Sequence, residues 1–237
     1  MRIIIALDIV DGKCVRLTRG DFSTKKIYNE DPLDIARKIE ENGIKYIHVV
    51  DLDGALSGQV VNYKTLETIS VSTSLKIDFS GGIRSSDDMS KAFEFGANQV
   101  TIGSISVIHP ALFLEWLAKW GKEKIILGAD CINRKIATGG WIESSDSDIF
   151  EFISDYRSKG IKYAICTDIG KDGTLNGPSV DLYKEILEIP GINLIASGGI
   201  SSVAEIDELS AIGCEGAIIG KALYEGILNL SDLGRLC

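Results

Sequence analysis

The sequence lacks the cysteine and histidine patterns that bind metal ions or form disulfide frameworks. Its cysteines are odd in number and scattered, without a CxxC pair: Cys14, Cys131, Cys166, Cys214 and Cys237. No cluster of histidine, cysteine and carboxylate residues has metal-ligand spacing, and neither a GxGxxG turn nor a P-loop occurs. These absences predict reduced cysteines and no metal or nucleotide site.

Positive charge and long apolar segments are also scarce. The 237 residues include 25 basic against 34 acidic side chains, a formal net charge of −9, which excludes a general nucleic-acid binder with a basic face. No uncharged apolar stretch approaches the roughly 20 residues that cross a bilayer, and Asp8 comes too early for the apolar core of a signal peptide. We therefore expect a soluble cytoplasmic protein that binds neither nucleic acid nor membrane, and that holds any anionic substrate by local groups.

The sequence does contain short β-rich segments that alternate with amphipathic helical segments. The candidate strands are Arg2–Leu7, Lys45–Val50, Leu75–Phe79, Gln99–Ile102, Lys124–Ala129, Tyr163–Thr167, Asn193–Ala196 and Gly216–Ile219. Several are apolar at nearly every position, as is typical of parallel strands covered on both faces. Helix start signals lie between them, namely Pro32, Pro110 and capping boxes that begin at Ser85 and Ser202. This pattern favours a closed (β/α)₈ barrel, with a doubly wound open sheet as the alternative.

An internal repeat favours the barrel. Residues 43–51 match residues 160–168, which lie 117 positions further along the chain. The two halves, about residues 1–120 and 121–237, each contain four candidate strands, and no linker rich in proline, glycine or serine separates them. Each half is too small to close alone, so we expect two half-barrels that together form one domain over residues 1–237.

Glycine-rich turns follow candidate strands in both halves. Each half has a Ser-Gly-Gly-Ile turn and then a shorter turn after the next strand. Their residues are Gly81, Gly82, Gly103 and Ser104 in the first half, and Gly198, Gly199, Gly220 and Lys221 in the second. Glycine lets the backbone approach a phosphate closely, and the N–H groups at a helix start point towards an anion. Two such sets in register predict two phosphate sites across the barrel mouth, and hence a substrate with a phosphate at each end.

Two aspartates end equivalent candidate strands in the two halves. Asp8 follows the first strand and Asp130 the fifth, on opposite sides of the mouth where barrel active sites are built. Proton transfer at carbon needs one group that removes a proton and another that supplies one, so this pair is the predicted catalytic centre. Asp51 and Asp168 also end strands, with structural and functional roles both open. Asp172, in a glycine-flanked loop, either reaches the substrate or forms a turn.

The remaining candidates depend on position alone. His48 lies within the second strand, and an inward orientation near Asp8 would make it a support residue. Trp141, in a loop after the fifth strand, either stacks on a planar ring of the substrate or packs within its loop. Three arginines beyond strand ends are candidates for clamping phosphate: Arg16, Arg19 and Arg84.

These residues together resemble a known family. The opening segment 5–17 is similar to that of the phosphoribosylformimino-aminoimidazole carboxamide ribotide isomerases of histidine biosynthesis. So are segments 48–55, 80–84 and 167–178, and the resemblance extends from about residue 1 to residue 226. It implies a (β/α)₈ barrel that acts on a bisphosphorylated small molecule without a cofactor.

The resemblance also implies a reaction and the residues that carry it. The reaction is an Amadori rearrangement of an aminoaldose to an aminoketose. An acid protonates the ring oxygen and opens the sugar to an imine, and a base then takes the C2 proton. Asp8 is the implied base and Asp130 the implied acid, with Thr167 and Asp172 in support. Gly177, in the same motif, is among the expected binding residues.

Two departures from the family pattern and three alternatives stay open. Ser80 stands where the family often has a third glycine, and Ser179 where it often has asparagine. One alternative is the cyclase subunit of imidazole glycerol phosphate synthase, although Arg16 and segment 167–178 resemble the isomerase better. The others are an isomerase that also accepts phosphoribosylanthranilate, and a barrel that only binds. We expect a monomer.

Overall fold

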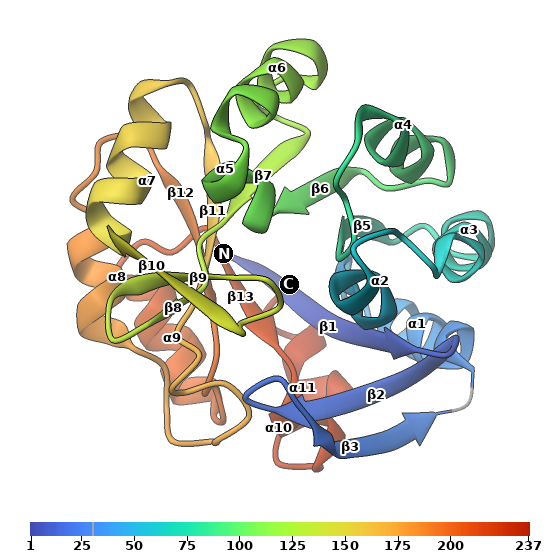
Figure 1. Ribbon diagram of the computed structural model, residues 1–237. Helices are drawn as coiled ribbons and strands as arrows, with labels where there is room; N and C mark the ends of the chain where they lie inside the picture. The colour runs from blue at the N-terminus through green and yellow to red at the C-terminus, as the bar shows by residue number, and fades with distance from the viewer. Residues whose placement is uncertain (30) are drawn as a thin grey trace.

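Eight parallel strands form the centre of the computed structural model, which describes residues 1–29 and 31–237 (Figure 1). The strands are β1 (Arg2–Val10), β4 (Tyr46–Asp51), β5 (Lys76–Ser80), β6 (Gln99–Ile102), β7 (Ile125–Gly128), β11 (Tyr163–Thr167), β12 (Asn193–Ser197) and β13 (Gly216–Ile219). Each pairs in parallel with the next, and β13 pairs back with β1, so the sheet is closed. The prediction of a (β/α)₈ barrel is therefore confirmed, and the open sheet is excluded.

The internal repeat is visible in the positions of the elements. Strands β4, β5 and β6 begin at Tyr46, Lys76 and Gln99, whereas β11, β12 and β13 begin 117 residues later, at Tyr163, Asn193 and Gly216. Strands from both halves complete one ring, so neither half closes by itself.

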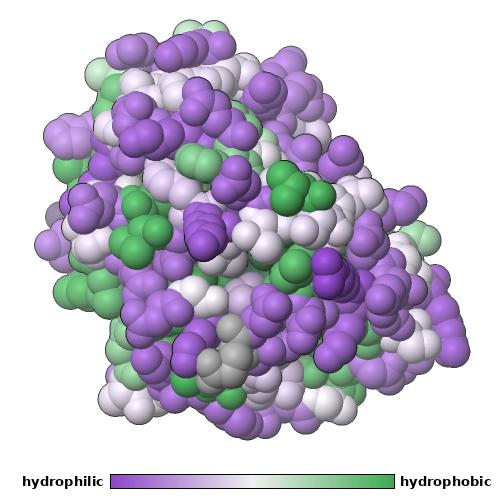
Figure 2. Space-filling view, turned by 90° about the vertical axis from the view of Figure 1, so that its right-hand side faces the viewer, coloured by the Kyte–Doolittle hydropathy of each residue, from purple (hydrophilic) through white to green (hydrophobic). Residues whose placement is uncertain are grey.

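Helices surround the ring and cover its outer face (Figure 1). The longer ones are α1 (Pro32–Glu41), α3 (Tyr63–Ser72), α4 (Ser86–Glu94), α6 (Pro110–Trp120), α7 (Ile149–Ser158), α8 (Val180–Ile186) and α9 (Val203–Ala211). Four short helices complete the set: α2 (Leu52–Ser57), α5 (Ser104–Ile108), α10 (Lys221–Tyr224) and α11 (Leu230–Gly234). Pro32 and Pro110 begin their helices, and both capping boxes, at Ser85 and Ser202, are formed. One outer face is largely hydrophilic, with small separate apolar patches (Figure 2).

The apolar core consists of two clusters, one outside the ring of strands and one inside it. The larger cluster packs strands against helices and includes Phe79 and Trp116. The smaller cluster fills the inside of the ring and consists of Ile4, Ala6, Ile126, Tyr163, Ile165, Ile195 and Ile218. At the N-terminal ends of the strands, the Arg2 guanidinium carbon lies 5.3 Å and 4.9 Å from the ring centroids of Tyr46 and Tyr163. This end of the barrel is therefore filled, which leaves the C-terminal end for a site.

Two insertions follow equivalent strands of the two halves, and the sequence did not predict them. After β1 come β2 (Lys13–Thr18) and β3 (Asp21–Asn29), and after β7 come β8 (Cys131–Ile132), β9 (Lys135–Thr138) and β10 (Glu143–Asp148). Strands β3 and β10 are mostly polar and exposed, so they lack the apolar alternation by which a strand is recognised. Because β1 continues to Val10, Asp8 lies inside this strand and not at its end.

All five cysteines are free thiols, four of them buried. Across the two described ranges, no helix combines the length and apolar character needed to span a membrane.

Candidate active site

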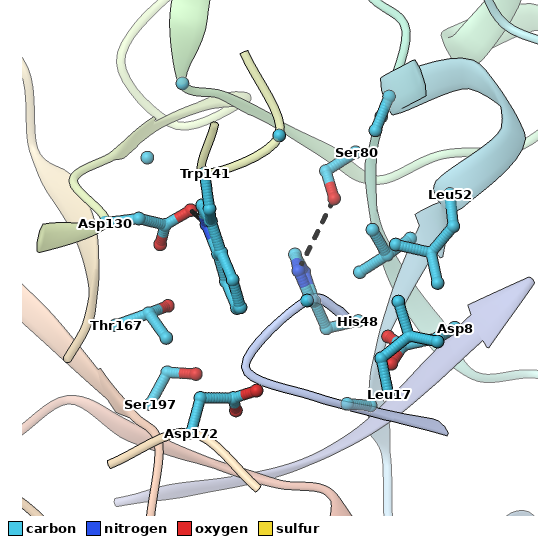
Figure 3. Close-up of a pocket in the computed structure, with 18 of the residues that line it drawn as sticks. Asp8, Leu17, His48, Leu52, Ser80, Asp130, Trp141, Thr167, Asp172 and Ser197 are labelled. Atoms are coloured by element: carbon cyan, nitrogen blue, oxygen red, sulfur yellow. Dashed lines mark hydrogen bonds between the residues drawn. The ribbon is translucent and has the colours of Figure 1, made fainter. Parts of the chain in front are cut away.

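A cavity of about 270 Å³ opens at the C-terminal ends of the barrel strands. All eight strands of the ring contribute at least one residue to its lining. Asp8 and Asp130 lie on opposite sides of this space, with His48 and Trp141 between them and Asp172 at one edge (Figure 3). The two predicted catalytic aspartates therefore share one cavity.

Asp8 projects from β1 and is held by an arginine. The Nη1 group of Arg16 donates a hydrogen bond to Asp8 Oδ2 at 2.6 Å. Arg16 is on β2, which runs antiparallel to β1 and places Val15 opposite Asp8. Both side chains are largely buried, with 10% of Arg16 and 17% of Asp8 exposed. Arg16 lines the cavity, and its partner there is the carboxylate of Asp8.

Asp130 follows β7 and accepts hydrogen bonds from two neighbours. The indole N–H of Trp141 donates to Asp130 Oδ2 at 2.8 Å, and the Thr167 hydroxyl is a second partner. Burial raises the pKa of Asp130 above its usual value, while these hydrogen bonds and the nearby His48 oppose the rise. Trp141 also contacts the insertion after β1, because a Cβ on Gly20 would lie 2.8 Å from its ring.

Asp172 is the third carboxyl group of the cavity and has a strongly altered acidity. Burial and the negative charge of Asp8 raise its pKa to about 6, while Arg16 opposes the rise. In the part of the chain that the structure describes, no group donates a hydrogen bond to this carboxyl. A carboxyl with a pKa of about 6 is half protonated near pH 6, where an ordinary surface aspartate is almost fully ionised.

His48 points into the barrel and belongs to a polar network. Its Nδ1 lies 2.6 Å from Oδ2 of Asp78, which also accepts a hydrogen bond from the hydroxyl of Thr101. On its other side, Nε2 lies 3.5 Å from Oγ of Ser80 (Figure 3). Burial lowers the pKa of His48, but the charge and hydrogen bond of Asp78 outweigh it and raise the pKa above the usual value. The raised pKa favours the protonated form of His48, whose positive charge would lie between the two aspartates.

The glycine turns of both halves face the cavity. Gly81, Gly82, Gly103 and Ser104 line it on one side, and Gly198, Gly199, Gly220 and Lys221 on the other. Over the described residues, none of their backbone N–H groups donates to a protein acceptor. Two sets of unsatisfied donors at the edges of one cavity are suited to bind two anionic groups.

The close packing of these turns explains why glycine is required. Gly82 and Gly199 have φ of 78° and 80°, in the left-handed region. A Cβ on Gly199 would lie 2.3 Å from the carbonyl oxygen of Gly177, and one on Gly82 would lie 2.7 Å from the backbone of Gln59. Gly177 does not line the cavity, and its N–H donates to Gly199 O at 3.1 Å. Its contribution is therefore to shape the turn.

Other predicted binding residues lie at the rim. Arg84 lines the cavity, and its guanidinium covers Gly58, where a Cβ would lie 2.6 Å away. Lys221 also lines the cavity, and its Nζ donates to Gly173 O at 2.9 Å and to Thr18 Oγ1 at 3.2 Å. Arg19 is exposed in the turn between β2 and β3 and does not line the cavity.

Two aspartates whose role the sequence left open hold loops together. Asp51 is fully buried and accepts hydrogen bonds from the N–H groups of Gly54, Val61 and Asn62 and from the Asn62 side chain. Asp168 accepts hydrogen bonds from the Gly170 N–H and from the hydroxyl of Ser179, one of the two departures from the family pattern. Neither aspartate lines the cavity.

The sequence analysis missed Asp78 and Ser197. Asp78 supports His48, and Ser197 lines the cavity beside the second glycine turn. Asp78 gave a usable signal, because it lies between Ile77 and Phe79 in a candidate strand, where a buried charge needs a partner. Ser197 was noticed only as part of the repeated turn.

The fold and the position of this cavity define a class, namely (β/α)₈-barrel enzymes with a site at the C-terminal ends of the strands. The chain belongs to a particular family of that class. A family model described as histidine biosynthesis protein matches residues 2–229. This match confirms the resemblance seen in the sequence.

Individual relatives agree over nearly the whole chain. A protein of Flavobacterium johnsoniae is 58% identical over 234 residues, which cover 98% of both chains. One from Flavobacterium psychrophilum is 57% identical over 98% of this chain and 97% of its own, and one from Parabacteroides distasonis is 55% identical over 99% of both. All three are named 1-(5-phosphoribosyl)-5-((5-phosphoribosylamino)methylideneamino)imidazole-4-carboxamide isomerase.

Proposed function

We propose that this protein is the isomerase for which these relatives are named, and that it converts the bisphosphorylated aminoaldose to its aminoketose in histidine biosynthesis. The observation that carries the proposal is the single cavity in which Asp8 faces two carboxyl groups of raised pKa, between two sets of unsatisfied backbone donors. An Amadori rearrangement needs one base, one acid and a way to hold the sugar between them.

Asp8 is the proposed base. The acid that opens the sugar ring transfers its proton to the ring oxygen, and Asp8 then takes the C2 proton. The pairing of Asp8 with Arg16 keeps the carboxylate in one orientation, with Arg16 Nη1 on Oδ2. The second oxygen of the carboxylate then faces the proton to be removed.

Two observations support Asp172, rather than Asp130, as the proposed acid. A general acid must carry a proton when the substrate binds, and the pKa of Asp172 is raised to about 6. Burial also raises the pKa of Asp130, but hydrogen bonds from Trp141 and Thr167 stabilise its ionised form and oppose the rise. Among the described residues, no such bond opposes the rise at Asp172. The sequence analysis named Asp130, and the variants described in the Discussion distinguish the two assignments.

The two phosphates of the substrate are proposed to bind the two sets of glycine turns. Each turn presents free N–H groups, and Lys221 adds a positive charge on the second side. Fixing both ends places the sugar between Asp8 and Asp172, and positioning of this kind can contribute roughly 7–11 kcal/mol to lowering the barrier. Trp141, at the mouth, is placed to stack on the planar imidazole ring.

Sulfate should reveal both anion sites. In crystals grown from ammonium sulfate without substrate, we expect one sulfate at Gly82 and Gly103 and another at Gly199 and Gly220. The backbone N–H groups there have no protein acceptor and attract a tetrahedral anion. Electron density for an anion on one side only, in both the sulfate and the substrate complexes, would contradict the bisphosphate proposal.

Growth of an auxotroph tests the function. A bacterial strain that lacks the isomerase should grow without histidine when it expresses this protein, and should not grow with the Asp8→Asn variant. Failure of the wild-type protein, present in folded form, would contradict the proposal. A second strain that lacks phosphoribosylanthranilate isomerase tests the dual-substrate alternative, since its growth without tryptophan requires that activity.

The remaining expectations are also proposals. We propose that the protein works in the cytoplasm as a monomer, without a metal or other cofactor, and that it binds neither nucleic acid nor membrane. The biosynthetic name of the relatives supports the location. The number of carboxyl groups in the cavity supports a mechanism that relies on side chains alone.

A further inference from the structure

Arg16 is enclosed by contacts that reach well beyond Asp8. Its Nη1 donates to Asp8, and its Nη2 donates to the carbonyl oxygen of Ala6 in the same strand. The Nε atom is buried and has no hydrogen-bond partner in residues 1–29 and 31–237. The two Nη groups of the guanidinium therefore bind the carboxylate of Asp8 and the backbone of β1, the strand that carries it.

Tyr224, from the far end of the chain, packs on the guanidinium of Arg16. The Arg16 Cζ lies 4.8 Å from the centroid of the tyrosine ring, a geometry in which cation and ring attract. The tyrosine hydroxyl donates at 3.0 Å to the carbonyl oxygen of Ala6 that also accepts from Arg16, and lies 3.4 Å from the Cys14 sulfur. The Ala6 carbonyl oxygen therefore accepts hydrogen bonds from both Tyr224 and Arg16, which links these two side chains to β1. Figure 1 shows α10, which ends at Tyr224, beside β2.

Gly220, in the shorter glycine turn of the second half, also lies close to the guanidinium of Arg16. A Cβ on Gly220 would lie 3.3 Å from Cζ of Arg16 and 3.4 Å from each Nη. The segment 220–224 therefore contributes both a residue of the cavity lining and the ring beneath Arg16. Its next residue, Glu225, is held by Lys26 and Tyr28 of β3, so the segment is anchored on both sides of Arg16.

We infer that Tyr224 is a positioning residue for the reaction, because its ring holds Arg16 in the one place from which it orients Asp8. This inference rests on the proposed isomerase function and on Asp8 as the base. Tyr224 does not line the cavity, so its effect reaches the substrate through Arg16 and Asp8. Without the ring, the guanidinium gains space to turn away from Ala6 and Asp8, and the carboxylate loses its fixed direction towards C2.

The test compares two replacements of Tyr224 with a matched control. Tyr224→Met keeps much of the side-chain volume but removes the ring, and it should lower kcat about 10- to 100-fold while KM changes less than about threefold, because misplacing a reacting group by about 1 Å costs about that much. Tyr224→Phe keeps the ring and should retain kcat within about threefold of the wild type. Tyr63→Leu removes a ring packed on Phe79 and Phe95, away from the cavity, and should leave both constants unchanged.

The outcomes separate this inference from the proposed function. Absence of aminoaldose turnover in the wild type would overturn the proposed function, and this inference with it. An active wild type together with a normal kcat in Tyr224→Met, or with an equally low kcat in Tyr224→Phe, would overturn the inference alone. If Tyr224→Met fails to fold, Tyr224→Leu provides the same measurement. It also removes the ring, and should lower kcat with little change in KM, whereas a normal kcat or a change confined to KM would overturn the inference.

Discussion

Replacing Asp8 with asparagine is expected to lower kcat about 10²–10⁴-fold, which is the usual cost of removing a positioned general base. Asparagine has the same shape and can still accept the hydrogen bond from Arg16 through its amide oxygen. It cannot take a proton. KM should stay close to the wild-type value, because the glycine turns that are proposed to hold the two phosphates are unchanged. Steady-state kinetics with the aminoaldose measure both constants.

Exchange of the C2 hydrogen with solvent identifies the step that Asp8→Asn blocks. In heavy water the wild type should release the C2 hydrogen to solvent and form an aminoketose with deuterium at C1, and the variant should not, since no base takes the C2 proton. Asp181→Asn is the matched control, because the same change is made on α8 at an exposed side chain. Normal exchange in Asp8→Asn would show that another group is the base and that Asp8 has a structural role.

Asp172→Asn should remove the general acid, with an expected loss of about 10²–10⁴-fold in kcat. The pH dependence of kcat/KM shows which protonation state of Asp172 is active. The wild-type kcat/KM should fall as pH rises through about 6, because the Asp172 carboxyl loses its proton there. Burial is the largest cause of this pKa; Asp8 and Asp130 also raise it, and Arg16 and Lys221 lower it. A substrate with two phosphates adds negative charge, so the corresponding fall in kcat should lie at higher pH.

Asp130→Asn distinguishes the two acid assignments. It loses a carboxylate that anchors Trp141, so its rate should also fall. The fall of kcat/KM near pH 6 should persist in this variant and disappear in Asp172→Asn. The reverse result, in which Asp130→Asn loses the pH dependence and Asp172→Asn keeps it, would return the acid role to Asp130. Both variants are expected to have a lower kcat, so the pH profile of kcat/KM is what distinguishes the residue that transfers the proton from the residue that holds Trp141.

The ring of the barrel was predictable because its signal is local and repeated. Several of the buried parallel strands are apolar at nearly every position, and segments of the first half recur in the second with an offset of 117 residues. The insertions after β1 and β7 were not predictable by the same criterion. Strands β3 and β10 are polar and exposed, and what stabilises them is pairing with β2 and β9.

The contact between Arg16 and Asp8 was not predicted, because strand β2 was not predicted. Without that strand, Arg16 lies in a loop beyond the barrel, from which an arginine can reach a phosphate. Antiparallel pairing of β2 with β1 places Val15 opposite Asp8 instead, and Arg16 beside that carboxylate. The roles of Asp51, Asp168 and Asp172 were open for a related reason. Each is an aspartate after a strand or in a loop, and only the partners brought by the fold, such as Asn62 for Asp51, distinguish a loop anchor from a cavity residue.

Direct observation of the product tests the central claim. The purified protein should be incubated with the aminoaldose labelled with ¹³C at the C1 and C2 carbons of the ribosyl group that rearranges, without ammonia or a partner protein. The claim predicts that the C2 signal moves to that of a ketone while C1 becomes a methylene carbon attached to nitrogen, and that the imidazole carboxamide stays intact. Unchanged signals in the presence of folded protein, or cleavage of the substrate with closure of a new imidazole ring, would contradict it.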